Sequence, residues 1–173
     1  VEGNRSVRLG NISTVLRDGD SLVPWEQYAL ALIAEVIDER PIYFSSSGNA
    51  AVSLGLTNYL VRQGLAYRLN NGPLEEVESA GGVIRMLPSP YEAVIGQWVD
   101  MPRTHTLLTE VFVHRTGIPD EWTHWPDLAT IGIPNYYAWG YLALSQAALQ
   151  TSDEELMEQY RERAEAWLRL GTG

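Results

Sequence analysis

The sequence contains no cysteine. This absence excludes disulfide bonds, thiol nucleophiles and thiolate metal ligands together. Long apolar runs are also lacking: the longest extends from Tyr28 to Ile37 and is interrupted by Glu35, whereas a bilayer-spanning helix needs about 20 residues. The N-terminal residues show neither the basic flank nor the apolar core of a signal peptide. Because the first residue is Val1 rather than an initiator methionine, we expect a piece of a longer protein.

Positive charge is scarce. Twelve basic residues stand against 22 acidic ones, so the net charge is −10. Such a surface repels phosphate backbones and anionic lipid headgroups, and we therefore expect no nucleic-acid partner. The content of hydrophobic residues, 45%, and the length of 173 residues are typical of one globular domain.

The N-terminal half alternates between helix-forming and strand-forming segments. A helix is predicted from Trp25 to Asp38, and because it is apolar on nearly every side we expect it to be largely buried. The segment from Ile42 to Phe44 has the composition of a strand, a helix is predicted over Ala50–Gln63, and a second strand over Leu65–Leu69. This order predicts two parallel strands joined by a helix, a βαβ unit. Another strand is predicted from Val83 to Leu87.

The C-terminal half is predicted to be helical. Helices are expected from His105 to Arg115, from Pro134 to Leu149, and after Ser152, where an S-x-x-E pattern is typical of a capping box. The last two helices form an αα-hairpin reminiscent of a tetratricopeptide unit. The fold class is therefore mixed α/β: a small sheet packed with helices over residues 1–98 and a helical part over residues 99–173, in one compact domain.

One candidate ligand-binding segment is the loop that follows the first predicted strand. Ser45, Ser46, Ser47, Gly48 and Asn49 join that strand to the N-terminus of a predicted helix, a place where backbone N–H groups bind anions. The chain has no P-loop, dinucleotide fingerprint or nucleophile elbow there. The alternative is that these small polar residues only turn the chain and cap the helix.

A second candidate is a concentration of aromatic residues in the C-terminal half. Trp122, Trp125, Tyr137 and Trp139 lie close in sequence, and stacked rings bind sugar rings or extended peptides. The alternative is that they fill the seam between the α/β part and the helical part.

The ionisable residues do not form a recognisable catalytic or metal-binding pattern. On a helix, the spacing of His105, Glu110 and His114 places His105 on a different face from the other two. We therefore predict no metal, no cofactor and no catalytic residue in this chain.

One stretch carries a family resemblance. The string Arg40-Pro41-Ile42-Tyr43-Phe44, followed by Gly55-Leu56 with Tyr59-Leu60 and then Gly64-Leu65-Ala66-Tyr67-Arg68-Leu69, resembles a segment of a family of multi-pass membrane proteins. The N-terminal membrane region of that family is similar to GT-C glycosyltransferases, its soluble C-terminal region often ends in tetratricopeptide-like helices, and a eukaryotic relative is a protein O-mannosyltransferase. The string covers about a quarter of the chain.

The resemblance implies a role and a location. It implies a periplasmic, extracytoplasmic accessory domain that positions an acceptor or stabilises the membrane-embedded half, with that half and an acceptor protein or glycan as partners. It supplies no catalytic residues, because in such enzymes the catalytic acids belong to the membrane half. Two alternatives remain: a protein-interaction module that uses the terminal helices, and a small-molecule enzyme with its site at the strand ends.

Overall fold

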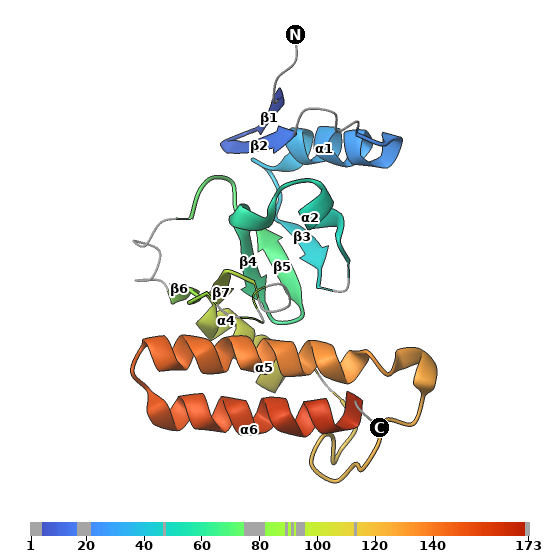
Figure 1. Ribbon diagram of the computed structural model, residues 1–173, viewed down its shortest axis with the longest axis vertical. Helices are drawn as coiled ribbons and strands as arrows, with labels where there is room; N and C mark the ends of the chain where they lie inside the picture. The colour runs from blue at the N-terminus through green and yellow to red at the C-terminus, as the bar shows by residue number, and fades with distance from the viewer. Residues whose placement is uncertain are drawn as a thin grey trace.

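The computed structural model describes residues 5–16, 22–46, 48–74, 82–88, 90, 92, 96–112 and 114–171. The molecule is elongated, with an N-terminal hairpin and helix at one end, a sheet in the middle and two long helices at the other end (Figure 1). None of the helices in these described segments is both long enough and apolar enough to cross a bilayer.

The N-terminal end combines a β-hairpin with one helix. Strands β1 (Arg5–Leu9) and β2 (Ile12–Leu16) pair antiparallel, and helix α1 (Pro24–Val36) agrees with the prediction. The expectation that this helix is largely buried is wrong. Only Leu30 and Ile33 of α1 are buried, because the hairpin and the sheet cover one side of the helix. The apolar side chains of Trp25, Tyr28 and Leu32 remain 48%, 78% and 60% exposed.

The centre of the molecule is a five-stranded sheet in the order β3-β5-β4-β7-β6. Its strands are β3 (Ile42–Ser45), β4 (Leu60–Gln63), β5 (Ala66–Leu69), β6 (Val83–Arg85) and β7 (Trp98–Asp100). The mixed α/β class is confirmed, as is the predicted strand that begins at Val83. Strand β7 spans the point where the sequence places the boundary between the two parts of the domain.

The predicted parallel βαβ unit is wrong. The helix expected over residues 50–63 is limited to α2 (Ala50–Ser53), and the short 3₁₀ turn η1 (Thr57–Tyr59) leads directly into β4. Strands β4 and β5 form an antiparallel hairpin around Gly64 and Leu65, and β3 pairs antiparallel with β5. Gly64 therefore serves as a turn residue, with a φ of 62°, and does not end a helix. Within the described strands, the parallel pairing is between β4 and β7.

The C-terminal part is helical, as predicted, but the helix expected from His105 to Arg115 begins earlier, at Met101, and ends at Val111, where Phe112 turns to an extended conformation. Helix α4 (Met101–Thr106) continues into a π-helical turn, η3 (Leu107–Val111), and a 3₁₀ turn, η4 (Leu128–Thr130), precedes the long helices. Helices α5 (Ile133–Gln150) and α6 (Glu154–Gly171) form the expected αα-hairpin. The cap of α6 is Asp153, whose Oδ1 accepts a hydrogen bond from the Leu156 N–H at 3.0 Å, and not the predicted Ser152.

Candidate functional site

A cavity of about 400 Å³ lies between α2, the central sheet and the segment that precedes β7. We call it the α2 pocket. Its volume falls within the range of about 300–1,000 Å³ that is usual for small-molecule sites. Four residues of the loop predicted as a binding segment, Ser45, Ser46, Gly48 and Asn49, line this pocket. Ser47 lies outside the described residues.

The floor of the α2 pocket is apolar and is set by the register of the sheet. Phe44 on β3 is paired with Tyr67 on β5, and Tyr67 is paired with Arg62 on β4. Directly opposed residues in antiparallel strands point to the same face, so these three side chains lie in one row. Phe44 and Tyr67 line the pocket together with Leu60, while Ala51 and Val52 of α2 form the wall above them.

The rim of the α2 pocket is polar. It carries Ser46, Asn49, Thr57, Glu92 and Gln97. The Gln97 Nε2 donates to Glu92 Oε1 at 2.8 Å, and Ser46 Oγ donates to the Leu65 carbonyl at 2.7 Å. Asn49 and Thr57 make no side-chain hydrogen bond to a described residue, so their polar groups can bond to a ligand. An apolar floor with such a rim suits a ligand that has both a hydrocarbon face and several hydrogen-bonding groups.

One glycine allows the chain to close over the floor. Gly96 has a φ of 85°, and a Cβ built on it would lie 2.8 Å from Cε1 of Tyr67. The backbone of this segment therefore rests against the edge of the Tyr67 ring, at a distance that a larger residue would not permit.

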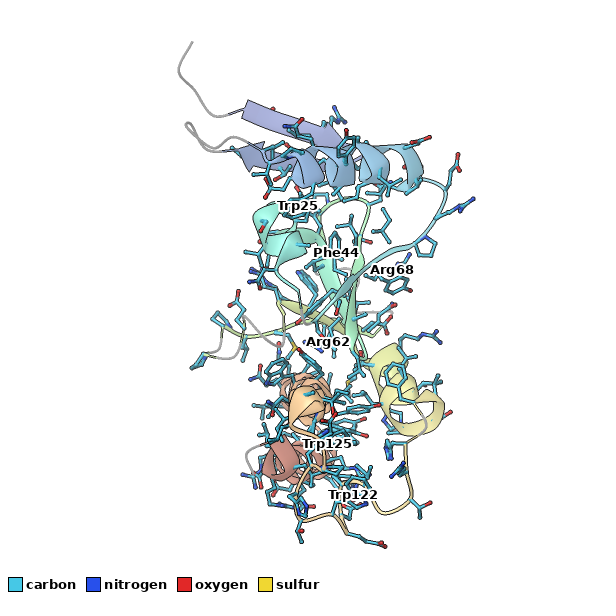
Figure 2. All side chains as sticks on the ribbon, turned by 90° about the vertical axis from the view of Figure 1, so that its right-hand side faces the viewer. Trp25, Phe44, Arg62, Arg68, Trp122 and Trp125 are labelled. Atoms are coloured by element: carbon cyan, nitrogen blue, oxygen red, sulfur yellow. The ribbon has the colours of Figure 1, made fainter. Side chains whose placement is uncertain are left out.

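Next to Tyr67 in this row lies a fully buried arginine, Arg62, at the place where the sheet meets α5 (Figure 2). Its guanidinium stacks 4.6 Å from the centre of the Tyr67 ring. It also donates to the Tyr67 hydroxyl, and its Nη1 donates to the Gly64 carbonyl at 3.0 Å. Desolvation by burial lowers the pKa of Arg62. The arginine therefore fixes the orientation of the ring that forms the pocket floor.

The structure does not assemble the four predicted aromatic residues into one surface. Tyr137 stacks on the buried Trp167 with ring centres 4.2 Å apart, while Trp139 contacts Tyr136 and packs on the cluster around Val99. Trp122 and Trp125 contact each other, with ring centres 6.0 Å apart, near the end of the molecule formed by α5 and α6 (Figure 2). All four are half-buried and pack against core clusters, but Trp139 alone of the four packs on the cluster that includes Val99 of the sheet, at the seam between the α/β part and the helical part.

The histidines considered for a metal site also have neighbours in the packed helical part. His105 Nδ1 lies 2.8 Å from the Tyr160 hydroxyl, and the His114 ring contacts the ring of Trp167. Across the described part of the chain, no three His, Cys, Asp or Glu side chains are grouped as a metal site would require.

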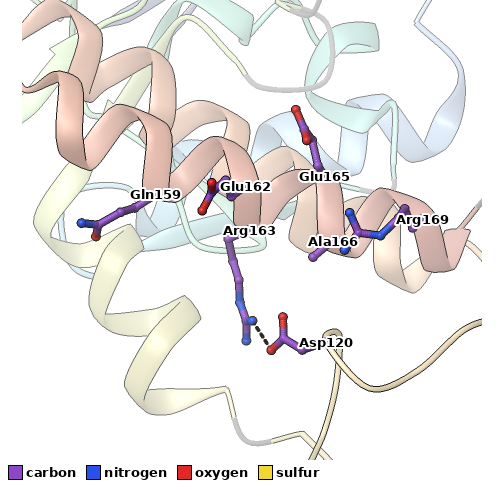
Figure 3. Close-up of a pocket in the computed structure, with 7 residues that line it drawn as sticks. All are labelled: Asp120, Gln159, Glu162, Arg163, Glu165, Ala166 and Arg169. Carbon is purple, nitrogen blue, oxygen red and sulfur yellow. Dashed lines mark hydrogen bonds and ion pairs between the residues drawn. The ribbon is translucent and has the colours of Figure 1, made fainter.

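A second surface depression lies along α6 (Figure 3). It has a volume of about 410 Å³, and its lining is mainly charged. Arg163 Nη1 pairs with Asp120 Oδ2 at 2.6 Å across it. Because Arg163 and Asp120 already form an ion pair and the depression lacks an apolar floor, it is a weaker candidate than the α2 pocket.

Comparison of the chain with protein-family models, with curated proteins and with solved structures finds no match. Function is therefore inferred from the geometry of the site and from the sequence resemblance.

Sequence patterns predict only part of the candidate site. Glu92 and Gln97 line the α2 pocket but come from a segment without a recognisable motif, and Thr57 occupies a position that the family string between Leu56 and Tyr59 leaves open. The proline-containing stretch before β7 has no periodic signal, and only the strand register brings it over Tyr67.

Proposed function

We propose that this chain is a non-catalytic, extracytoplasmic accessory domain of a glycosyltransferase-like membrane protein. In this proposal the α2 pocket holds part of the acceptor, a protein or a glycan, and α1 contacts the membrane-embedded half. The observation that carries the proposal is the α2 pocket itself, with its apolar floor and its polar rim.

The lining of the α2 pocket supports binding rather than acid–base chemistry. Glu92 is the single carboxylate among the described residues that line it, and that group already accepts a hydrogen bond from Gln97. Hydrolysis of a glycosidic bond generally requires two carboxyl groups at a defined separation. A lone, hydrogen-bonded carboxylate among amides and hydroxyls is better suited to orienting a ligand.

The exposed side of α1 supports the second part of the proposal. Trp25, Tyr28 and Leu32 follow one another at helical spacings of three and four residues, so they lie on one face. We call this stripe the α1 surface. Contiguous exposed apolar side chains of this kind commonly mark sites of contact with another protein or a membrane.

A bulky substitution at Gly48 tests the role of the α2 pocket. Gly48 lines the pocket, and a Cβ built there has its nearest neighbouring atom at 4.0 Å, so Gly48→Trp should obstruct the pocket without strain. The probes are neutral monosaccharides and an acetylated serine- or threonine-containing tripeptide, at up to about 10 mM, with amide chemical shifts as the readout. We expect at least one probe to shift the pocket resonances, and Gly48→Trp to weaken that binding at least about tenfold.

The matched control is Gly132→Trp. Gly132 lies at the start of α5, away from the α2 pocket, and a Cβ built there has similar space around it. It should leave probe binding unchanged, and both variants should keep Tm within about 2 °C of the parent. The proposal for the pocket fails if no probe perturbs the pocket, or if the two variants weaken binding equally.

A further inference from the structure

We propose that the α2 pocket is one half of a longer cleft that binds a short, neutral oligosaccharide. This inference rests on the proposed function and names the ligand class of its site. A second cavity, of about 350 Å³, adjoins the pocket and shares two lining residues with it, Glu92 and Gln97. Because these two residues line both cavities, their hydrogen-bonded side chains form the partition between them.

The second cavity is lined by a residue whose amide donor lacks a partner. The Nε2 atom of Gln150, at the C-terminal end of α5, is buried and makes no hydrogen bond to a described residue. A buried amide without a partner costs free energy, which would be recovered if the Gln150 side chain turned toward the cavity and donated to a ligand acceptor. The Gln150 amide and the α2 pocket therefore lie on opposite sides of the Glu92–Gln97 partition, and each independently indicates a place for a ligand.

The charges around the cleft favour a neutral ligand. Arg85 lines the second cavity and Glu92 lines both cavities, so an ion of either sign would meet a like charge. The C-terminal end of α5, where Gln150 lies, adds a partial negative charge. A neutral group that both donates and accepts hydrogen bonds suits this mixture, and a hydroxyl does both.

The shape and the lining of the cleft select sugars among neutral ligands. In the α2 pocket, the half-buried Phe44 presents apolar surface on which the C–H face of a sugar ring can pack, and the edge of Tyr67 extends that surface. Amides and hydroxyls follow along the rim from Asn49 and Thr57 through Gln97 to Gln150. A linear oligosaccharide would thus place one ring on the floor of the α2 pocket and the next beyond the partition, with a hydroxyl accepting from Gln150 Nε2.

The test compares monosaccharides with their trisaccharides. The probes are glucose and maltotriose, N-acetylglucosamine and chitotriose, and mannose and an α-linked mannotriose, titrated against the whole chain by NMR. For at least one pair we expect the trisaccharide to bind about tenfold more tightly than the monosaccharide. Gln150→Leu should lower the affinity for the trisaccharide to that for the monosaccharide and leave monosaccharide binding unchanged, whereas Gly48→Trp should weaken both.

The control is Gln159→Leu, the same substitution on the exposed side of α6, which should change neither affinity. Equal affinities for monosaccharide and trisaccharide, or no effect of Gln150→Leu, would overturn the two-cavity cleft while leaving the α2 pocket as a binding site. Binding of the acetylated tripeptide with no binding of any sugar would overturn the ligand class but not the proposed function. If none of the probes binds, both proposals fail.

Discussion

At the scale of single residues, Arg62 is the side chain on which the centre of the molecule most depends. It is fully buried and donates hydrogen bonds to the Gly64 carbonyl and the Tyr67 hydroxyl. Arg62→Met keeps much of the volume but leaves both acceptors buried without this donor. We expect the free energy of unfolding to fall by about 3 kcal/mol, measured by urea denaturation.

Arg62→Lys separates charge from geometry. An ammonium group keeps the positive charge but cannot reproduce the planar fork that reaches two acceptors and stacks on a ring. We therefore expect Arg62→Lys to recover less than half of the stability lost in Arg62→Met. Full recovery would show that the charge, and not the shape of the guanidinium, is what matters there.

The same scale explains why the candidate site could be predicted only in part. Ser45, Ser46, Gly48 and Asn49 are clustered in sequence, so a local pattern identifies them. Glu92 and Gln97 carry no local signal, because their position depends on the pairing of β7 with β4. The sequence also predicts that Tyr137 and Trp139 do not share a surface. On a helix, side chains two residues apart point in directions that differ by about 200°.

At the scale of elements, the helices were easier to predict than the strands. The helix α1 and the α5–α6 hairpin have long periodic patterns, with a proline in the first turn of each of α1 and α5. The segment from residue 50 to residue 63 was predicted wrongly because Leu56, Tyr59 and Leu60 fit both a helix stripe and a strand. Gly55, which has a φ of 67°, breaks the helix, and pairing with β5 then favours the strand at Leu60–Gln63.

The α5–α6 hairpin should lose stability at alkaline pH. Tyr141 and Tyr160 are buried in it, and desolvation raises the pKa of both phenols. Each folded-state pKa lies above the unfolded value of about 10, so the stabilisation is complete below pH 10 and is lost as pH rises through the folded pKa values. We expect the free energy of unfolding to fall by up to about 1.4 kcal/mol per pH unit for each tyrosine.

Removing one phenol checks this assignment. Tyr160→Phe should make the alkaline decline in the free energy of unfolding less steep, by the contribution of about one proton. Urea denaturation between pH 9 and pH 12, a range that covers and extends above the ordinary tyrosine pKa of about 10, measures this. Tyr28→Phe, on the exposed side of α1, provides the comparison and should leave the decline unaltered. A decline of the same steepness in all three proteins would contradict the burial of Tyr160 as its cause.

At the scale of the whole molecule, the α1 surface lies at the end opposite the α5–α6 hairpin (Figure 1). If the α1 surface contacts the membrane-embedded half, a charge placed on this surface should lower the thermal stability of the parent protein but not that of the isolated chain. We expect Leu32→Glu to lower the Tm of the detergent-solubilised parent by several degrees, about what a loss of 1–2 kcal/mol produces. The Tm of the isolated chain should change by less than about 2 °C, because Leu32 is already exposed.

Leu128→Glu is the matched comparison. Leu128 is 81% exposed and lies in η4, in the helical part of the molecule, so the same chemical change is made away from α1. It should leave both the parent and the isolated chain unaffected. Equal losses in the parent for the two substitutions would argue that α1 has no special role in contact with the membrane half.

The joint between β4 and β7 has a mechanical consequence. It has one register pair, Arg62 with Val99, whereas the β3–β5 and β4–β5 ladders have four pairs each. Hydrogen bonds from Gln63 to Asp100 and between Thr104 and the β4–β5 hairpin also cross it. The first and last described elements, β1 and α6, lie toward opposite ends of the long axis (Figure 1). Tension applied along this axis would be carried in series across the joint, so the joint should open before the four-pair ladders on its N-terminal side.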